Sequence, residues 1–166
     1  MKLRKAILQD APVVIQLVKE LAEYENLSEA VTARFPDLER WLFEEEKAEV
    51  WLCESQGRDV GFISFFYNFS TFRGKPGIYL EDIFIRQEFR GSGVGKMMLS
   101  HLAKLAVERG CDRIDWMCLN WNQSAISFYQ TLGAKPITNW MPYRLWGSSL
   151  SELAENADST LGGVSI

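Results

Sequence analysis

The stretch that most constrains this chain covers residues 79–109, where a glycine-rich turn separates an apolar run from an amphipathic one. The apolar run predicts a buried strand, and apolar residues at helical spacing after the turn predict a helix. Gly91, Gly93 and Gly95 fall at alternate positions in the turn. Glycine allows the backbone to approach a ligand closely, and the first N–H groups of a helix have no partner within the helix. The turn is therefore predicted to bind a phosphate group.

Positive charge surrounds this turn, because Arg90 precedes its glycines and Lys96 follows them. The helix dipole adds about half an elementary charge of the same sign. The spacing excludes a P-loop, which needs four residues between its first glycine and the Gly-Lys pair, whereas three lie between Gly91 and Gly95. A dinucleotide fingerprint is also excluded, because its third glycine falls one position later. A turn that uses glycine only for its geometry remains the alternative.

Length and composition indicate one globular domain. The chain has 166 residues, of which 47% are hydrophobic and 13% aromatic. No apolar run reaches the roughly 18 residues of a membrane-spanning helix, and the first residues lack the apolar core of a signal peptide. We expect a soluble, cytoplasmic protein. The net charge of −4 argues against a general nucleic-acid binder.

Cysteine and histidine are too few for a disulfide framework or a histidine-rich metal site. Cys53, Cys111 and Cys118 have no CxxC spacing, and His101 is the only histidine. We interpret all four as packing or surface residues and expect no metal.

The order of predicted elements indicates an α/β (α+β) fold, with a mixed central sheet and helices on both faces. We expect strands at 2–7, 50–54, 60–69, 78–86, 113–119 and 135–145, and helices at 10–24, from 36, from the glycine turn to 109, and at 122–133. Asp10 and Asn122 are the expected N-caps. Residues 150–154 could add one or two helical turns. We expect a single domain over residues 1–155 and a flexible tail over 156–166.

Two motifs resemble the signatures of the Gcn5-related N-acetyltransferases (GNAT). Arg90, Gly93 and Gly95 match the Arg-x-x-Gly-x-Gly signature, whose loop holds the pyrophosphate of acetyl-coenzyme A in that family. Residues 121–129, followed by residues 132–134 (Leu-Gly-Ala), match the helix on the coenzyme side. The predicted order of strands and helices is also that of the family, and this resemblance extends over nearly the whole chain. The resemblance implies an N-acetyltransferase that uses acetyl-CoA and needs no metal.

Three shorter matches narrow the resemblance to the spermidine/spermine (diamine) acetyltransferase branch, which includes thialysine-acetylating relatives. They are the segments 23–25 (Glu-Tyr-Glu), 79–82 (Tyr-Leu-Glu-Asp) and 121–122 (Trp-Asn). Members of the branch are homodimers whose amine pocket lies near the subunit interface. The resemblance thus implies a homodimer that acetylates a small-molecule amine and has no nucleic-acid or membrane partner.

Acetyl transfer to an amine needs a proton acceptor and a proton donor. An alkylamine with a pKa of about 10.4 is almost wholly protonated at pH 7, so a base must remove its proton. The resemblance implies that Glu81 accepts this proton and that Tyr129 protonates the leaving thiolate. From the residues alone, Glu81 could be a surface or helix-capping carboxylate and Tyr129 a core aromatic. Asp82 lies on the opposite face of the strand from Glu81 and is expected to be structural.

For the coenzyme, the resemblance implies contacts on both sides of a groove. The main-chain N–H groups of residues 83–85 lie next to the pantetheine arm in relatives, and they are the expected donors to the oxyanion. The full predicted set is Ile83, Phe84, Ile85, Arg90, Gly91, Ser92, Gly93, Val94, Gly95, Lys96, Asn122, Ser124 and Ala125.

The amine pocket is implied by the matches at Tyr24 and Glu25, together with Glu81. A surface loop with ordinary acids is the alternative. The sequence departs from the polyamine branch at Ser70 and near Met141, where acids are expected. Because a long polycation would lose partners there, a shorter amine or a thialysine-like amino acid is at least as well supported as spermidine.

Three other functions stay open at the level of sequence. A protein or peptide N-acetyltransferase would use the same fold and chemistry. A non-catalytic acetyl-CoA sensor would keep the fold without the turnover, and a nucleotide-binding module would use the glycine turn for another phosphate. The sequence names neither the amine nor the physiological role.

Overall fold

The computed structural model describes residues 1–160, with side chains to residue 157. The chain divides into two compact units, Met1–Ile126 and Ser127–Ile166. The first unit contains the sheet and its covering helices, and the second contains the end of one helix, an irregular segment and a last helix. Each unit is considered by itself.

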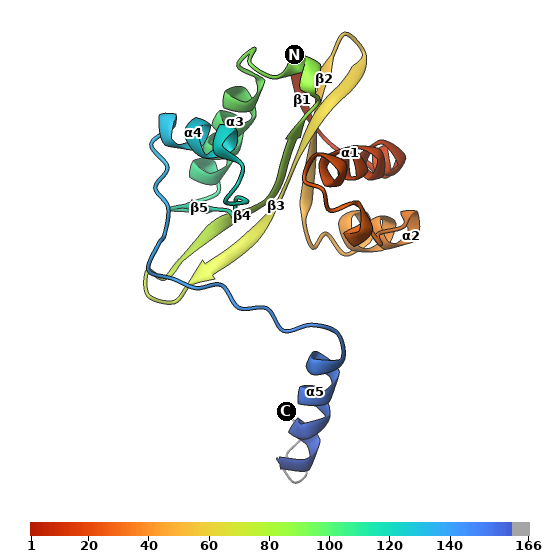
Figure 1. Cartoon of the computed structure of the whole chain (residues 1–166), viewed down its shortest axis with the longest axis vertical. Coiled ribbons are helices and arrows are strands. Elements are labelled where there is room, and N and C mark those ends of the chain that lie inside the picture. The colour runs from red at the N-terminus through yellow and green to blue at the C-terminus, as the bar shows by residue number, and fades with distance from the viewer. Residues whose placement is uncertain (161–166) are drawn as a thin grey trace. The chain divides into compact units, whose positions relative to one another are not determined.

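A mixed sheet organises the first unit (Figure 1). Its strands, in spatial order, are β1 (Lys2–Lys5), β2 (Glu49–Ser55), β3 (Arg58–Ser70), β4 (Lys75–Ile85) and β5 (Ile114–Asp115). Neighbours pair antiparallel from β1 to β4, whereas β4 and β5 pair parallel. The predicted α/β class with a mixed central sheet is confirmed, and the predicted strands at 50–54 and 60–69 form the antiparallel pair β2–β3.

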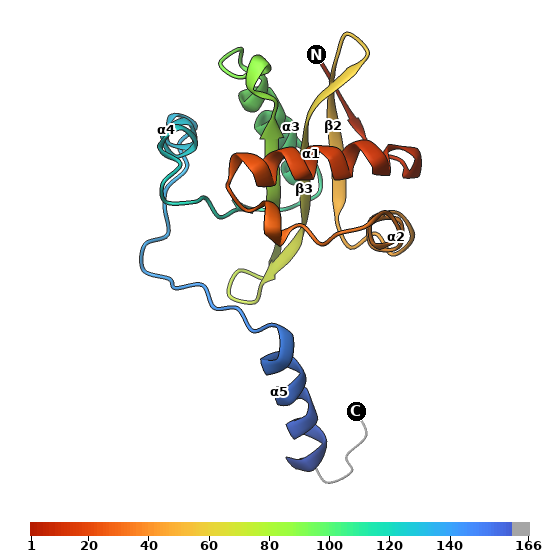
Figure 2. The same ribbon diagram turned by 45° about the vertical axis from the view of Figure 1, so that its right-hand side comes forward.

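Helices cover both faces of this sheet, as predicted (Figures 1 and 2). The helices of the first unit are α1 (Ala11–Tyr24), α2 (Phe35–Leu38), which continues as a π-helical stretch over Glu39–Glu44, and α3 (Val94–Glu108). Helices α1 and α2 lie on one face and α3 on the other. Between residues 1 and 160, none of the helices has the length and apolar character needed to cross a membrane.

The hydrophobic core on the α1 face of the sheet explains why α1 packs against strands β2, β3 and β4. Val14 and Leu17, one helical turn apart on α1, pack with Leu52 of β2, Phe62 of β3 and Phe84 of β4, all nearly inaccessible to solvent. Burying a side chain of this size contributes about 1.5–3 kcal/mol. The end of β4 is therefore fixed against α1.

One residue interrupts the pairing of β3 with β4. Phe65 lies opposite Leu80 and Ser64 lies opposite Asp82, so Glu81 has no residue opposite it. This extra residue is a β-bulge, which bends a strand and redirects its side chains.

The predicted N-caps Asn122 and Asp10 both stand at the N-cap positions of their helices, but only Asn122 caps its helix with its side chain. The Asn122 Oδ1 accepts the Ala125 N–H at 3.2 Å at the start of α4 (Gln123–Thr131). The Asp10 side chain makes no cap bond to α1. It accepts the N–H of Ile7 at 2.9 Å and binds the Arg4 guanidinium at 2.6 and 2.9 Å, so it ties the preceding 3₁₀ turn to β1. The Arg4 hydrogen bonds lower the pKa of Asp10.

Two predicted strands are corrected. Of residues 113–119, only Ile114 and Asp115 form a strand. Residues 135–145 form no strand, because a strand needs the N–H and C=O groups of a neighbour, and the second unit contains no strand in its described part. The alternating pattern of residues 135–145 is that of a strand, but these residues have no neighbouring strand with which to pair.

Helix α5 (Gly147–Thr160) is longer than predicted. The sequence predicted one or two turns at residues 150–154, and the helix also includes residues 147–149 and 155–160, of which 156–160 were expected to belong to a flexible tail. Residues 161–166 of the predicted tail lie outside the described residues. The single-domain boundary at residue 155 stays a prediction.

The substitution Gly61→Ala tests how close the backbones of β3 and β4 must lie. A Cβ at Gly61 would lie 2.4 Å from the carbonyl oxygen of Phe84, a backbone atom that cannot turn aside. We expect urea unfolding to show a loss of about 1–3 kcal/mol. Gly77→Ala is the matched control, because its Cβ would meet side chains of Asn68 and Arg113, which can move. Equal losses for the two variants would contradict this explanation.

Candidate functional site

The glycine-rich turn has the geometry of an anion-binding loop at the N-terminus of α3. Gly91 and Gly93 have φ values of 74° and 86°, in the left-handed region that favours glycine. Gly93 is the N-cap and has no side chain to bind the first N–H groups of the helix. A Cβ added at either glycine would meet no atom within 4 Å, so the space beside the turn is open. Backbone N–H groups and the helix dipole can therefore hold a phosphate here.

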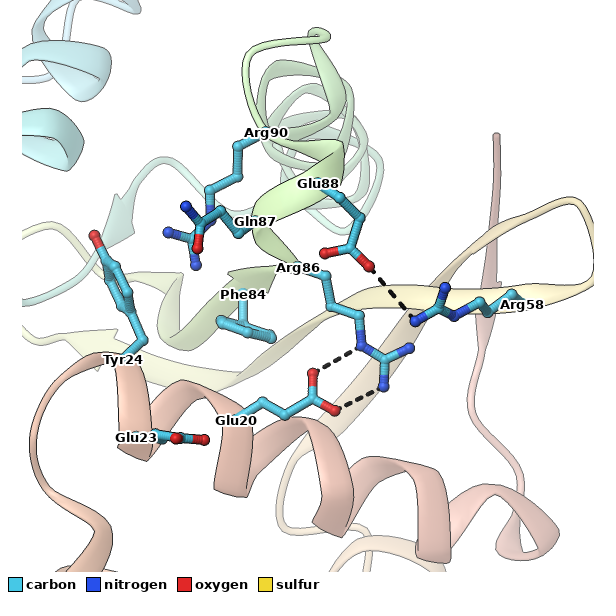
Figure 3. A pocket seen from close by; sticks show the side chains of 9 residues that line it. All are labelled: Glu20, Glu23, Tyr24, Arg58, Phe84, Arg86, Gln87, Glu88 and Arg90. Atoms are coloured by element: carbon cyan, nitrogen blue, oxygen red, sulfur yellow. Dashed lines mark hydrogen bonds and ion pairs between the residues drawn. The ribbon is translucent and has the colours of Figure 1, made fainter.

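Arg90 extends away from the turn and toward α1 (Figure 3). Its Nε donates to the carbonyl oxygen of Ile85 at 2.7 Å, and its guanidinium lies 4.2 Å from the centre of the Tyr24 ring. The cation therefore contacts a residue predicted to line the amine pocket. Its predicted contact with the coenzyme pyrophosphate stays a prediction.

The free edge of β4 lies next to the turn. β5 pairs with β4 only at Ile78 and Tyr79, so the rest of that edge has no strand beside it in the described part of the chain. The N–H of Arg86 donates to Val60 of β3 at 2.9 Å. Because backbone groups alternate along a strand, Ile83 and Ile85 present theirs to the free edge. These backbone groups can pair with the amides of a pantetheine arm.

Phe84 lies between these two residues and has a different environment. Its side chain is buried in the core against α1, with 6% of its surface exposed. Any contact of Phe84 with a coenzyme would therefore use its backbone. The side chain instead anchors the strand.

Tyr24 connects the predicted amine pocket with a predicted coenzyme residue. Its hydroxyl donates to the Oδ1 of Asn122 at 3.4 Å, the same oxygen that caps α4. Its ring also lies 6.1 Å from that of Trp121. The structure thus brings together Tyr24, Arg90 and Asn122, which sequence reasoning had assigned to two different ligands.

Two partly buried acids lie near each other beside β4. Asp82 accepts the hydroxyl of the buried Ser64 at 2.8 Å, and burial raises the pKa of Asp82. Burial, followed by the charge of Asp82, raises the pKa of Glu25. Within residues 1–157 neither acid forms an ion pair, and no group of three His, Cys, Asp or Glu residues could hold a metal ion. Unpaired buried carboxylates are costly, so this pair is suited to bind a cation from solution.

Glu81 and Tyr129, the predicted catalytic residues, belong to different units. Glu81 is exposed at the bulge of β4. In the second unit the Tyr129 ring lies 5.5 Å from that of Phe128, and its carbonyl accepts the N–H groups of Leu132 and Ala134 where α4 ends. Their catalytic roles stay predictions.

A cavity of about 460 Å³ opens between the C-terminal half of α1 and the end of β4 (Figure 3). It is lined by Glu20, Glu23, Tyr24, Arg58, Phe84, Arg86, Gln87, Glu88 and Arg90. The Arg86 guanidinium binds both carboxylate oxygens of Glu20, at 2.7 and 2.8 Å. Sequence reasoning missed this cavity, because its walls are about 60 residues apart in the chain and no motif connects them.

Comparison with known proteins assigns the fold and the glycine turn to a family. A family profile described as acetyltransferase (GNAT) family matches residues 15–134. The chain belongs to this family. The matched range includes β4, the glycine-rich turn, α3 and α4, and GNAT acetyltransferases use acetyl-CoA as co-substrate. The resemblance drawn from the two motifs is confirmed.

The relatives of this GNAT protein include acetyltransferases of small molecules. Thialysine N-epsilon-acetyltransferase of Sus scrofa is 34% identical over 164 residues, covering 92% of this chain and 96% of the relative. L-ornithine N5-acetyltransferase of Arabidopsis thaliana is 42% identical over 94 residues, 57% of this chain and 41% of the relative. Spermidine/spermine N(1)-acetyltransferase-like protein 1 of Homo sapiens is 29% identical over 164 residues, 94% of this chain and 24% of the relative. These relatives support the predicted branch.

Solved structures agree on the GNAT fold. An integron cassette protein from V. cholerae superimposes with a TM-score of 0.78 at 25% identity, covering 93% of this chain and 97% of that protein. An aminoglycoside acetyltransferase from a soil metagenome superimposes with a TM-score of 0.74 at 18% identity, over 87% of this chain and 96% of that one. At such identity the second match concerns the fold alone.

The substitution Asp82→Asn tests whether Asp82 is an unpaired buried acid. The pKa of Asp82 is raised in the folded state. Ionisation of Asp82 therefore destabilises the folded protein as the pH rises from the unfolded pKa of 3.8 through the raised folded pKa. At pH 7 the variant should therefore be more stable in urea, by more than the ~0.5 kcal/mol typical of surface changes. This gain should shrink as the pH falls toward 3.8.

Glu29→Gln, which removes an exposed acid, is the control for the loss of one negative charge. It should leave the unfolding free energy nearly unchanged at both pH values. A variant at Asp82 that is less stable than the natural protein at pH 7 would mean that a favourable partner holds the carboxylate.

Proposed function

We propose that this protein transfers the acetyl group of acetyl-CoA to the primary amine of a small molecule. The acceptor is a polyamine, a diamine or an amino acid with an amine side chain, such as thialysine or ornithine. The observation that carries the proposal is the partly buried carboxylate of Asp82 on β4, which accepts the hydroxyl of Ser64 at 2.8 Å and, like that of Glu25, forms no ion pair in residues 1–157. Membership in the GNAT family and the names of the relatives support the same reaction.

The coenzyme would bind along the edge of β4 and over the glycine turn. The open space at Gly91 and Gly93 and the free N–H groups of α3 fit a pyrophosphate. Lys96 lies in the first turn of α3 and adds positive charge. The backbone groups of Ile83 and Ile85 fit the amides of the pantetheine arm.

The amine would bind as an ammonium ion against Glu25, which the sequence predicted for this role, and against Asp82, which the sequence predicted to be structural. A carboxylate pair shielded from water attracts a cation more strongly than an exposed pair, because screening is weaker. The Tyr24 ring supplies an aromatic face beside it. Removing the proton of this ammonium then produces the neutral nucleophile.

In the chemical step the amine nitrogen forms a bond to the acetyl carbon while the bond from that carbon to sulfur breaks. Glu81 would take the amine proton through a water molecule, and Tyr129 would give a proton to the departing thiolate. Negative charge develops on the carbonyl oxygen, and the main-chain N–H groups at the free edge of β4 are suited to stabilise it.

A panel of acceptors with acetyl-CoA tests this function. We expect thiol release with at least one of spermidine, putrescine, ornithine, lysine and thialysine, and none with a lysine peptide. Glu81→Gln and Tyr129→Phe should each lower kcat by about ten- to a thousandfold, the usual range for acid–base groups. The pH dependence of kcat should change in the same variants.

The control for this assay is Glu29→Gln, which removes a carboxylate at an exposed position. This variant should retain full turnover. Binding of the coenzyme without turnover of any acceptor would contradict the proposal and favour a sensor, and turnover of the peptide alone would favour a protein acetyltransferase. Family and relatives do not favour these alternatives.

We also propose that the protein is a cytoplasmic homodimer. Trp140, Tyr143 and Trp146 are exposed by 70% or more, and large exposed apolar groups mark interaction surfaces. The three cysteines are free, as expected in a reducing compartment. Sedimentation equilibrium should give twice the 19.0 kDa of one chain. A Trp140→Ser, Tyr143→Ser double variant should sediment as a monomer, and an unchanged dimer would place the interface elsewhere.

A further inference from the structure

Ser64 is a buried hydroxyl residue that stands among apolar neighbours on β3. Its partner in register on β2 is Val50, and Phe62 lies two residues before it on the same face of β3. Val50 and Phe62 belong to the core beneath α1, and only 7% of the Ser64 surface is exposed. In residues 1–157 no other hydroxyl residue is buried. Because a hydroxyl without a hydrogen bond is costly in such surroundings, packing alone does not explain this serine.

The hydrogen bond of Ser64 is made to Asp82, which lies opposite it on β4. The Ser64 hydroxyl donates to the Asp82 Oδ2 at 2.8 Å. A hydrogen bond to an ionised acceptor is about twice as strong as one between neutral groups. The bond therefore favours the ionised carboxylate. Burial, the larger effect, raises the pKa of Asp82, and the bond to Ser64 lowers it.

The same bond also fixes the orientation of the Asp82 carboxylate. With Oδ2 bound to Ser64, the other oxygen, Oδ1, forms no hydrogen bond or ion pair within residues 1–157. Ser64 and Asp82 are the last residues in register before the bulge, because the pairing shifts between Ser64 and Phe65. The bond thus holds Asp82 in place directly beside the predicted base Glu81.

Acids rather than bases surround this carboxylate. Glu25, at the end of α1, lies close enough that burial and then the charge of Asp82 raise its pKa. Burial and then the charge of Glu25 raise the pKa of the Cys118 thiol. In residues 1–157 no lysine, arginine or histidine forms an ion pair with Asp82 or Glu25. In that part of the chain, Ser64 is therefore the side chain that favours a negative charge at Asp82.

We infer that Ser64 is a positioning residue of the acceptor site. Its hydroxyl holds the Asp82 carboxylate ionised and oriented, and this carboxylate then binds the ammonium group of the acceptor. This inference rests on the proposed function, which places the ammonium against Asp82. Ser64 acts through Asp82 and not by contact with the acceptor.

A serine with a purely structural role would give a different result when it is replaced. If Ser64 serves only the stability of the fold, Ser64→Ala lowers the free energy of unfolding, and the kinetic constants of the folded protein stay the same. If Ser64 acts on the acceptor through Asp82, the variant changes the KM for the amine and the pH dependence of kcat/KM. These two readouts separate the roles.

Ser64→Ala should be assayed with the most active free amine of the acceptor panel, at saturating acetyl-CoA. We expect the KM for the amine to rise by about ten- to a hundredfold at pH 7, because a hydrogen bond to a charged group is lost. The KM for acetyl-CoA should stay the same. The acid side of the pH profile of kcat/KM should move to higher pH, since Asp82 then needs a higher pH to ionise.

A double-mutant cycle with Asp82→Asn tests whether the effect passes through Asp82. In the Asp82→Asn background, Ser64→Ala should change the KM for the amine by less than about twofold, because the group on which the hydroxyl acts is gone. If turnover of Asp82→Asn is too slow, calorimetric binding of the amine in the presence of coenzyme A supplies the same four values. Ser100→Ala, at an exposed position of α3, is the matched control and should change neither the KM nor the pH profile.

Two results would overturn the inference. One is an acid side of the pH profile that lies at the same pH in Ser64→Ala and in the natural protein. The other is a loss of amine affinity that is as large in the Asp82→Asn background as without it. Either would leave the proposed acetyltransferase intact and make Ser64 a structural residue. No turnover of any free amine by the natural protein would instead reject the proposed function, and the inference with it.

Discussion

The free edge of β4 is the constraint on which the rest of the site depends. β4 has a neighbour along its whole length on the β3 side, but β5 pairs with it only at Ile78 and Tyr79. Backbone N–H and C=O groups need partners, so an edge that is left open next to a helix N-terminus is suited to bind a ligand with amides and phosphates. The bulge at Glu81 lies where this open edge begins, and the burial of Phe84 against α1 fixes its other end.

The same strand also carries a cost in stability. Asp82 interrupts an apolar stretch and is partly buried, and its pKa is raised because the charged form loses solvent. Ser64 supplies one hydrogen bond, and Glu25 adds a second acid nearby. A fold selected only for stability would place apolar residues there, so the two acids fit the ammonium site that is proposed for the acceptor.

Tyr24 contacts residues that the proposed reaction assigns to the coenzyme, and it lies next to one assigned to the acceptor. Its hydroxyl binds Asn122 at the start of α4, its ring lies beneath Arg90 from the glycine turn, and its chain neighbour is Glu25. In the proposed reaction, a substitution at this residue would change the surroundings of both the coenzyme and the acceptor. Contacts of this kind make the order and the affinity of the two ligands depend on each other.

Much of the fold and part of the site could be read from the sequence, because the interactions that form them are local. The glycine turn needs only neighbouring residues, and the cap at Asn122 needs the N–H three residues later. What the sequence could not give depends on segments far apart in the chain. The bulge at Glu81 is defined by β3, the cavity joins α1 to residues about 60 positions later, and residues 135–145 had a strand-like pattern but no strand to pair with. Sequence alone determined the class of the fold and its glycine-rich turn, through periodicity and glycine spacing. Only the tertiary structure decided which charges are left unpaired, because the partner of a charge is set by packing and not by its position in the chain.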